Sequence, residues 1–348
     1  MNELILSLIM CPITKEKLTL CTKNELNNIL DNKINVIEEK NYLINESKTY
    51  LYPVSHTGYP ILLPEEAIPI SINSQHSDLF SLFKEHKQNL ENVYKKIDFK
   101  KNPFAESEKW YIYWRTAITK PLVENLIPGS ILDAGGGFGF FRRFTKGRFH
   151  LNLDVSEEML NNDNSPDKIL GRTESIPLLS NSFDNIVCIG SIEHSQDVKT
   201  TLSELVRCLK PKGKFLLASY SDDWPKILST TPWAFTYCIY LLETYYLMFK
   251  QNPMLFVEKA LGRLNLRKTK TEKAFKPLWG GEDQRKIQIR RFNPNTLEEM
   301  LTKAGLRVLK KGRCGKNFPG KISPPRKIID HYFNSMKYGQ YLFFVCEK

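Results

Sequence analysis

The chain has 348 residues, of which 41% are hydrophobic and 25% are charged. These proportions are typical of a folded globular protein, and they exclude a disordered chain and a protein built of many membrane spans. The length exceeds one average domain, so we expect a core domain of about 200 residues with one or two attachments.

The net charge of +12 is concentrated in the C-terminal third. Residues 250–348 contain 23 Lys and Arg against 8 Asp and Glu, whereas residues 1–249 contain 27 against 30. This asymmetry favours an anionic partner, either a nucleic acid, an acidic membrane surface or a phosphorylated substrate. A basic surface that is merely well solvated is the alternative.

The seven cysteines are widely spaced, and no two of them form a C-x-x-C pair. An odd, scattered set favours reduced thiols and a cytoplasmic protein. Residues 1–10 have neither a basic n-region nor a small-residue cleavage site. We therefore expect no signal peptide there and expect the first residues to fold.

The N-terminal third predicts two kinds of structure. In residues 1–70, prolines and Gly58 interrupt brief apolar runs, which indicates short strands joined by turns. Residues 75–128 predict helices, with a break near Asn102 and Pro103 and an aromatic-rich second helix around residues 110–114.

From Ser130 onward, short apolar runs alternate with stretches of helix length, which is typical of βαβ units and a parallel sheet. Residues 222–292 interrupt this alternation. It resumes with a helix that begins near Pro294 and ends before Gly305. The fold class is therefore α/β, and the predicted strands are residues 130–134, 150–155, 168–170, 185–190, 214–220, 307–311 and 341–348.

The run ILDAGGGFG at residues 131–139 predicts a strand that ends in an acid and turns through three glycines. Glycine is needed where the backbone turns sharply and approaches a ligand too closely for a β-carbon. A dinucleotide-binding dehydrogenase would have a further glycine three positions after Gly137, where this chain has Phe140. The spacing therefore disfavours NAD.

Asp154 ends the next predicted strand, 21 residues after Asp133. A carboxylate at this place lies beside the glycine-rich turn and can accept hydrogen bonds from both hydroxyls of an adenosine ribose. The alternative is that Asp154 only caps the helix that follows.

Six motifs occur in a fixed order from Asp133 to Phe215: DAGGGFG, DVSEEML, GRTESIP, SFDNIV, IEH and LKPKGKF. This series resembles the class I S-adenosylmethionine (SAM)-dependent methyltransferases, in particular the subgroup that includes the quinone-biosynthesis enzymes. The resemblance implies a Rossmann-like seven-stranded sheet, SAM as the cofactor and transfer of its methyl group.

The resemblance also implies roles for individual residues. The cofactor-binding positions would be Asp133, Gly135, Gly137, Gly139, Asp154, Val155, Met159, Arg172, Thr173, Gly190 and Ser191. Arg172 stands where the family commonly has an Asp for the adenine amino group, so adenine would be read by the backbone of Thr173 or by stacking. His194 is the candidate general base, oriented by Glu193, although the pair could simply pack the following helix.

The opening segment resembles the short zinc-ribbon domain that accompanies or activates several methyltransferases. Of the four ligand positions only Cys11 is a cysteine, because Thr14, Asn45 and Lys48 occupy the other three. A structural zinc ion needs four ligands. We therefore expect a metal-free ribbon held by apolar packing, with a rebuilt site using Cys21 and His56 as the alternative.

Residues 222–292 are the expected substrate side. Residues 232–249 are apolar and aromatic with Glu243 as the one charge, and a basic stretch follows at 263–276. This combination suits either a peripheral contact with an anionic membrane or a buried lid helix. A membrane span is disfavoured, because Glu243 would lie inside the bilayer.

These observations predict five parts of the chain: a ribbon-like segment at 1–70, a helical linker or lid at 71–128, a SAM-binding core at 129–221, a substrate or lid insertion at 222–292, and a closing helix and strands at 293–348. The expected function is methyl transfer to a small-molecule or lipid-linked acceptor. An RNA methyltransferase and a non-catalytic SAM-binding protein are the alternatives, and the absence of an N-P-P-Y-type base-reading motif disfavours RNA.

We predict that the purified chain carries no stoichiometric zinc, because three of the four ligand positions hold Thr14, Asn45 and Lys48. Elemental analysis of protein prepared without added metal measures this. One tightly bound zinc ion per chain would contradict the prediction.

Overall fold

The computed structural model describes residues 2–30, 41–70, 78–94, 119, 122–222, 290–314 and 341–348. The predicted insertion at 222–292, with its aromatic and basic stretches, lies outside the described residues except at its ends, as does most of the predicted helical region between residues 95 and 121. Among the described helices, none is long and apolar enough to cross a membrane.

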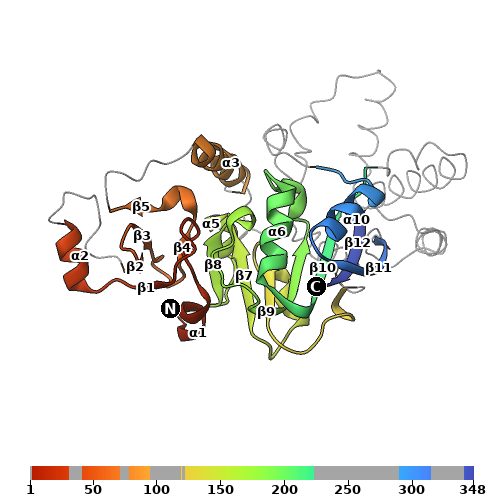
Figure 1. Cartoon of the computed structure of the whole chain (residues 1–348), viewed down its shortest axis with the longest axis horizontal. Helices are drawn as coiled ribbons and strands as arrows, with labels where there is room; N and C mark the ends of the chain where they lie inside the picture. The colour runs from red at the N-terminus through yellow and green to blue at the C-terminus, as the bar shows by residue number, and fades with distance from the viewer. Residues whose placement is uncertain are drawn as a thin grey trace, which may run out of the picture.

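An eight-stranded sheet forms the centre of the molecule, in the order β11-β12-β10-β9-β6-β7-β8-β4 (Figure 1). The strands from β6 to β10 run parallel, and β12 is antiparallel to both β10 and β11. Their bounds are β4 (Ile61–Leu62), β6 (Ile131–Ala134), β7 (His150–Asp154), β8 (Lys168–Gly171), β9 (Phe183–Ile189), β10 (Leu209–Tyr220), β11 (Arg307–Cys314) and β12 (Tyr341–Glu347). This confirms the predicted Rossmann-like sheet of seven strands and adds an eighth, β4.

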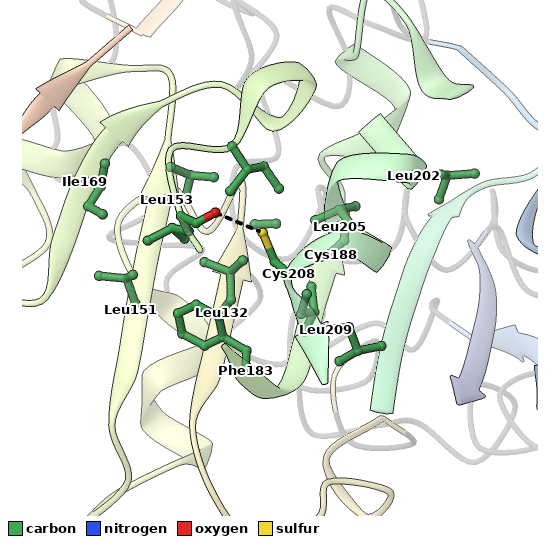
Figure 2. Packing of buried hydrophobic residues seen from close by; sticks show 14 of the residues in the cluster. Leu132, Leu151, Leu153, Ile169, Phe183, Cys188, Leu202, Leu205, Cys208 and Leu209 are labelled. Carbon is green, nitrogen blue, oxygen red and sulfur yellow. Dashed lines mark hydrogen bonds between the residues drawn. The ribbon is translucent and has the colours of Figure 1, made fainter. Parts of the chain in front are cut away.

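Helices cover the sheet because their apolar residues recur at helical spacing. α6 (Val198–Cys208) is capped by Asp197, whose carboxylate accepts hydrogen bonds from the N–H groups of Lys199 and Thr200. Leu202 and Leu205 of α6 pack with strand residues such as Leu132 in the main core (Figure 2). α5 (Glu157–Asn161) follows β7.

The C-terminal helix α10 (Pro294–Lys303) has the predicted boundaries. Asn293 caps its first turn, Pro294 occupies the first helical position, and Gly305 adopts a positive φ of 93° just after its end. Leu297 and Leu301 are fully buried on its inner face.

The N-terminal segment forms a four-stranded antiparallel sheet in the order β1-β2-β3-β5. The elements here are α1 (Glu3–Leu8), β1 (Leu18–Leu20), α2 (Lys23–Leu30), β2 (Tyr42–Asn45), β3 (Tyr50–Pro53), β5 (Ile68–Pro69) and the 3-10 turn η1 (Pro64–Glu66). Ile5, Ile9 and Cys11 belong to the same buried cluster as the strands of the central sheet. The segment is therefore packed onto the core.

The strand β4, which the sequence did not predict, joins the N-terminal segment to the central sheet. Ile61 pairs with Leu170, and Leu62 pairs with Gly171, in parallel with β8. Without this pairing, β8 would be the edge of the sheet, with unpaired N–H and C=O groups. The N-terminal segment therefore covers the edge of the central sheet that lies beside the predicted cofactor loops (Figure 1).

Asn45 is the centre of a hydrogen-bond network at the positions that resemble zinc ligands. Its Oδ1 accepts from the N–H groups of Thr49 and Tyr50 at 2.9 and 2.8 Å, and its Nδ2 donates to Glu16 and to Thr14. The side chain is 1% exposed. Polar contacts thus join the strands at these positions, in addition to the apolar packing that the sequence predicted.

We expect Asn45→Ala to lower the free energy of unfolding by about 1–3 kcal/mol, because it leaves the N–H groups of the half-buried Thr49 and the buried Tyr50 without an acceptor. Chemical denaturation measures the change. Lys48→Ala is the matched control, because its ion pair with Glu25 is exposed and should contribute little to the free energy of unfolding. Equal effects of the two substitutions would contradict this account of Asn45.

Candidate functional site

The glycine-rich turn after β6 has the backbone that the sequence predicted. Gly135 and Gly137 have φ values of 73° and 58°, a region that disfavours residues with a β-carbon. A β-carbon on Gly135 would lie 1.9 Å from Oγ of Ser191, which follows β9. The turn therefore packs directly against the end of the neighbouring strand.

Asp154 connects this turn to the end of β7. Its Oδ2 accepts a hydrogen bond from the N–H of Gly137, and its Oδ1 accepts one from the N–H of Ser156, both at 2.9 Å. Burial raises the pKa of Asp154 to about 6, although the same two hydrogen bonds act to lower it. Each carboxylate oxygen has a second lone pair available for a ligand hydroxyl.

A pocket opens at the carboxyl ends of β6, β7, β8 and β9. Parallel strands bring their carboxyl ends to one edge of a sheet, so residues distant in sequence meet there. Eight of the predicted residues line the pocket: Gly135, Asp154, Val155, Arg172, Thr173, Gly190, Ser191 and His194. The pocket also contains residues that sequence reasoning missed: His86, Leu90, Leu153, Gly171, Glu174 and Ser195.

Four predicted residues are not among those that line the pocket: Asp133, Gly137, Gly139 and Met159. Asp133 is 3% exposed, and its Oδ2 lies 3.3 Å from Nε2 of the buried His150. A β-carbon on Gly139 would lie 2.7 Å from the carboxylate of Asp163. The predicted contacts of these four residues with the cofactor stay predictions.

Arg172 forms part of the pocket wall, but its guanidinium is held by N-terminal residues. Its Nε and Nη2 donate to Oε1 of Glu65 at 2.8 and 2.6 Å, and Nη2 also donates to the carbonyl of Phe83. The guanidinium carbon lies 4.4 Å from the centre of the Phe83 ring. Arg172 thereby fixes η1 and the helix α3 (Asp78–Tyr94) at the carboxyl edge of the sheet (Figure 1).

The residues that follow β9 also line the pocket. Gly190 has a φ of 67° and donates its N–H to the carbonyl of Ala218 on β10. His194 ends the 3-10 turn η4 (Ile192–His194) and is half-buried. Glu193, the predicted orienting residue, is fully buried, and its Oε2 accepts a hydrogen bond from Oγ of Ser219 at 2.9 Å.

Glu174 joins two of the loops that line the pocket. Its Oε1 accepts from Oγ of Ser195 at 3.2 Å and from the N–H of Gln196 at 2.8 Å. An acid one residue after Thr173, in the loop that the motifs already identified, is the signal by which sequence reasoning could have found it. His86 had a weaker signal: a histidine between Phe83 and Leu90 at the spacing of one helix face.

Residues 132–217 match the family model described as a methyltransferase domain. The matched segment runs from β6 to β10, the part of the chain that carries the six motifs. This segment is a class I SAM-dependent methyltransferase domain. SAM is its cofactor.

Two curated relatives match parts of this chain. The ubiquinone/menaquinone biosynthesis C-methyltransferase of Rickettsia typhi is 35% identical over 78 residues, which are 20% of this chain and 32% of that protein. The tRNA U34 carboxymethyltransferase of Nautilia profundicola is 30% identical over 136 residues, 36% of this chain and 45% of that protein. The chain spans less than half the length of either relative.

Among solved structures, the chain is similar to one described as the complex between the Haloferax volcanii Trm112 methyltransferase activator and a methyltransferase. The likeness has 17% sequence identity and a TM-score of 0.43, and it covers 72% of this chain and 98% of the other.

The pocket wall fits the chemical groups of SAM. Asp154 offers carboxylate oxygens for the ribose hydroxyls, and Leu153 and Val155 offer apolar surface for the adenine ring. Gly135 lines the pocket with backbone alone, because glycine has no side chain that could keep a ligand away.

We predict that Asp154→Ala weakens SAM binding by about 1.5–3 kcal/mol, because charge-assisted hydrogen bonds to the ribose are lost. Calorimetry with purified protein measures this. Asp197→Ala, which removes an exposed carboxylate outside the pocket, is the matched control and should leave the affinity unchanged.

The pKa of Asp154 implies that the affinity for SAM depends on pH. Its ionised form accepts hydrogen bonds from the ribose hydroxyls, so affinity should be nearly full at pH 7, about half of that at pH 6 and about tenfold lower at pH 5, as the carboxylate is protonated. Asp154→Asn should flatten this profile. A wild-type profile as flat as that of Asp154→Asn would show that this carboxylate does not bind the ribose.

Proposed function

We propose that the chain transfers the methyl group of SAM to a small-molecule or lipid-linked acceptor. One observation supports this most strongly: the turn at Gly135, the carboxylate of Asp154 and the end of β9 at Ser191 line one pocket at the carboxyl ends of the parallel strands, which is where open α/β sheets generally bind ligands. The relative from Rickettsia typhi is named as a C-methyltransferase of quinone biosynthesis, which is consistent with a small or lipid-linked acceptor.

SAM supplies an activated methyl group on a sulfonium. The chain's contribution is then mainly alignment and the exclusion of water, since in-line transfer to a nucleophile requires the reacting atoms to meet in one orientation. Asp154 would hold the ribose, the backbone at Gly190 and Ser191 would hold the methionine portion, and Val155 would contact the adenine. Leu90 of α3 would shield the pocket from solvent.

His194 is the residue proposed to handle a proton. It lies at the carboxyl end of β9, in the same pocket as Gly190 and Ser191. An acceptor hydroxyl loses its proton when the methyl group is transferred, and an imidazole can accept that proton or position the hydroxyl.

RNA methylation is the second candidate. The relative from Nautilia profundicola is named as a tRNA U34 carboxymethyltransferase, and residues 250–348 carry 23 basic against 8 acidic residues. Both observations favour an anionic acceptor.

The experiment that separates the candidates is a screen for transfer of labelled methyl groups to lipid, small-molecule and RNA fractions, each with and without ribonuclease. Label that depends on intact RNA would replace our first proposal with the second.

We predict that His194→Ala reduces turnover on the acceptor found in that screen by roughly 10²-fold or more, with SAM affinity nearly unchanged, because the loss is confined to proton transfer. Steady-state kinetics and calorimetry measure the two quantities. His56→Ala, an exposed histidine of the N-terminal segment, is the control. Turnover of His194→Ala within a few fold of wild type would leave alignment as the main source of catalysis.

A further inference from the structure

His86 lines the pocket from α3 and has one ring nitrogen already engaged. Its Nδ1 lies 3.3 Å from Nη1 of Arg172. A guanidinium can only donate hydrogen bonds, so Nδ1 must be the acceptor and the proton of the neutral ring must be on Nε2. Burial and the charge of Arg172 lower the pKa of His86 to about 4, which keeps the ring neutral at physiological pH.

The Nε2–H group of His86 has no hydrogen-bond partner among the described residues, although it is shielded from solvent. A buried donor without a partner is unfavourable, and native proteins usually pair such groups with protein, water or a ligand. Because His86 is part of the pocket wall, a bound ligand is a suitable source for the missing acceptor.

The surroundings of His86 indicate which part of the ligand lies nearby. Its partner Arg172 directly precedes Thr173, and α3 also packs against α5, which follows Val155. Val155 and Thr173 are the residues proposed to hold adenine. The guanidinium of Arg172 is itself engaged by Glu65, Phe83 and His86.

We propose that Nε2–H of His86 donates a hydrogen bond to a ring nitrogen of the SAM adenine. This inference rests on the proposed function. A histidine of α3 would then recognise adenine. The side chain of Arg172 does not provide this recognition, because other residues hold it. Adenine has three ring nitrogens that accept hydrogen bonds, so an uncharged imidazole donor matches its chemistry.

Calorimetry of S-adenosylhomocysteine binding to the full chain tests the proposal with two substitutions. The amide oxygen of His86→Asn can replace Nδ1 as the acceptor for Arg172, but its side chain is too short to replace Nε2–H. His86→Gln places an amide N–H near the position of Nε2. We expect His86→Asn to weaken binding by about 3- to 10-fold and His86→Gln to retain most of the affinity.

Equal affinity of wild type and His86→Asn would overturn the inference, whereas failure of wild type to bind would overturn the proposed function instead. Deaza analogues, which replace one ring nitrogen by C–H, identify the partner atom: one of them should bind wild type more weakly but affect His86→Asn little. Equal losses for both proteins with every analogue would contradict an adenine partner.

A measurement on wild type alone keeps the test independent of whether the variants fold. In nuclear magnetic resonance spectra of ¹⁵N-histidine-labelled protein, the Nε2–H proton of His86 should move downfield and exchange more slowly once S-adenosylhomocysteine is bound. A resonance that does not change on saturation with this ligand would also overturn the proposal.

Discussion

The buried ion pair between Arg172 and Glu65 is the interaction on which the arrangement of the pocket depends. Both side chains are 1% exposed, and their nitrogen and oxygen atoms are 2.6 Å apart. Removing one partner of such a pair leaves an uncompensated buried charge, which typically costs about 3–5 kcal/mol. The pair joins the loop after β8 to the N-terminal segment, and the contacts of Arg172 with Phe83 and His86 extend the connection to α3. The N-terminal segment therefore helps to build the pocket as well as to cover the sheet.

The parallel sheet explains why this connection matters for chemistry. Four neighbouring strands deliver the glycine-rich turn, Asp154, the loop at Thr173 and the turn at Ser191 to one edge. These groups line the pocket from the sheet, and His86 and Leu90 line it from α3. A cofactor held between the two would be oriented by the rigid strand ends and shielded by the helix.

Much of the core was predictable because its signals are local. The apolar strands, the glycine-rich turn and the start and stop of α10 each follow from a few adjacent residues, and the structure confirms them. The strand β4 was not predicted, since two residues carry no periodic signal and their partner β8 is more than a hundred positions away. The same separation hid the pairing of Arg172 with Glu65 and hence the place of His86. Sequence alone identified Arg172 as a departure from the family pattern, but its partner depends on how α3 and η1 dock.

The most direct test of the whole account is a crystal structure of the full chain with S-adenosylhomocysteine. We predict that the ligand lies in the pocket at the carboxyl ends of β6 to β9, with its ribose hydroxyls on the carboxylate of Asp154 and its adenine between Val155 and α3. A ligand bound elsewhere, or one whose ribose does not contact Asp154, would contradict the account.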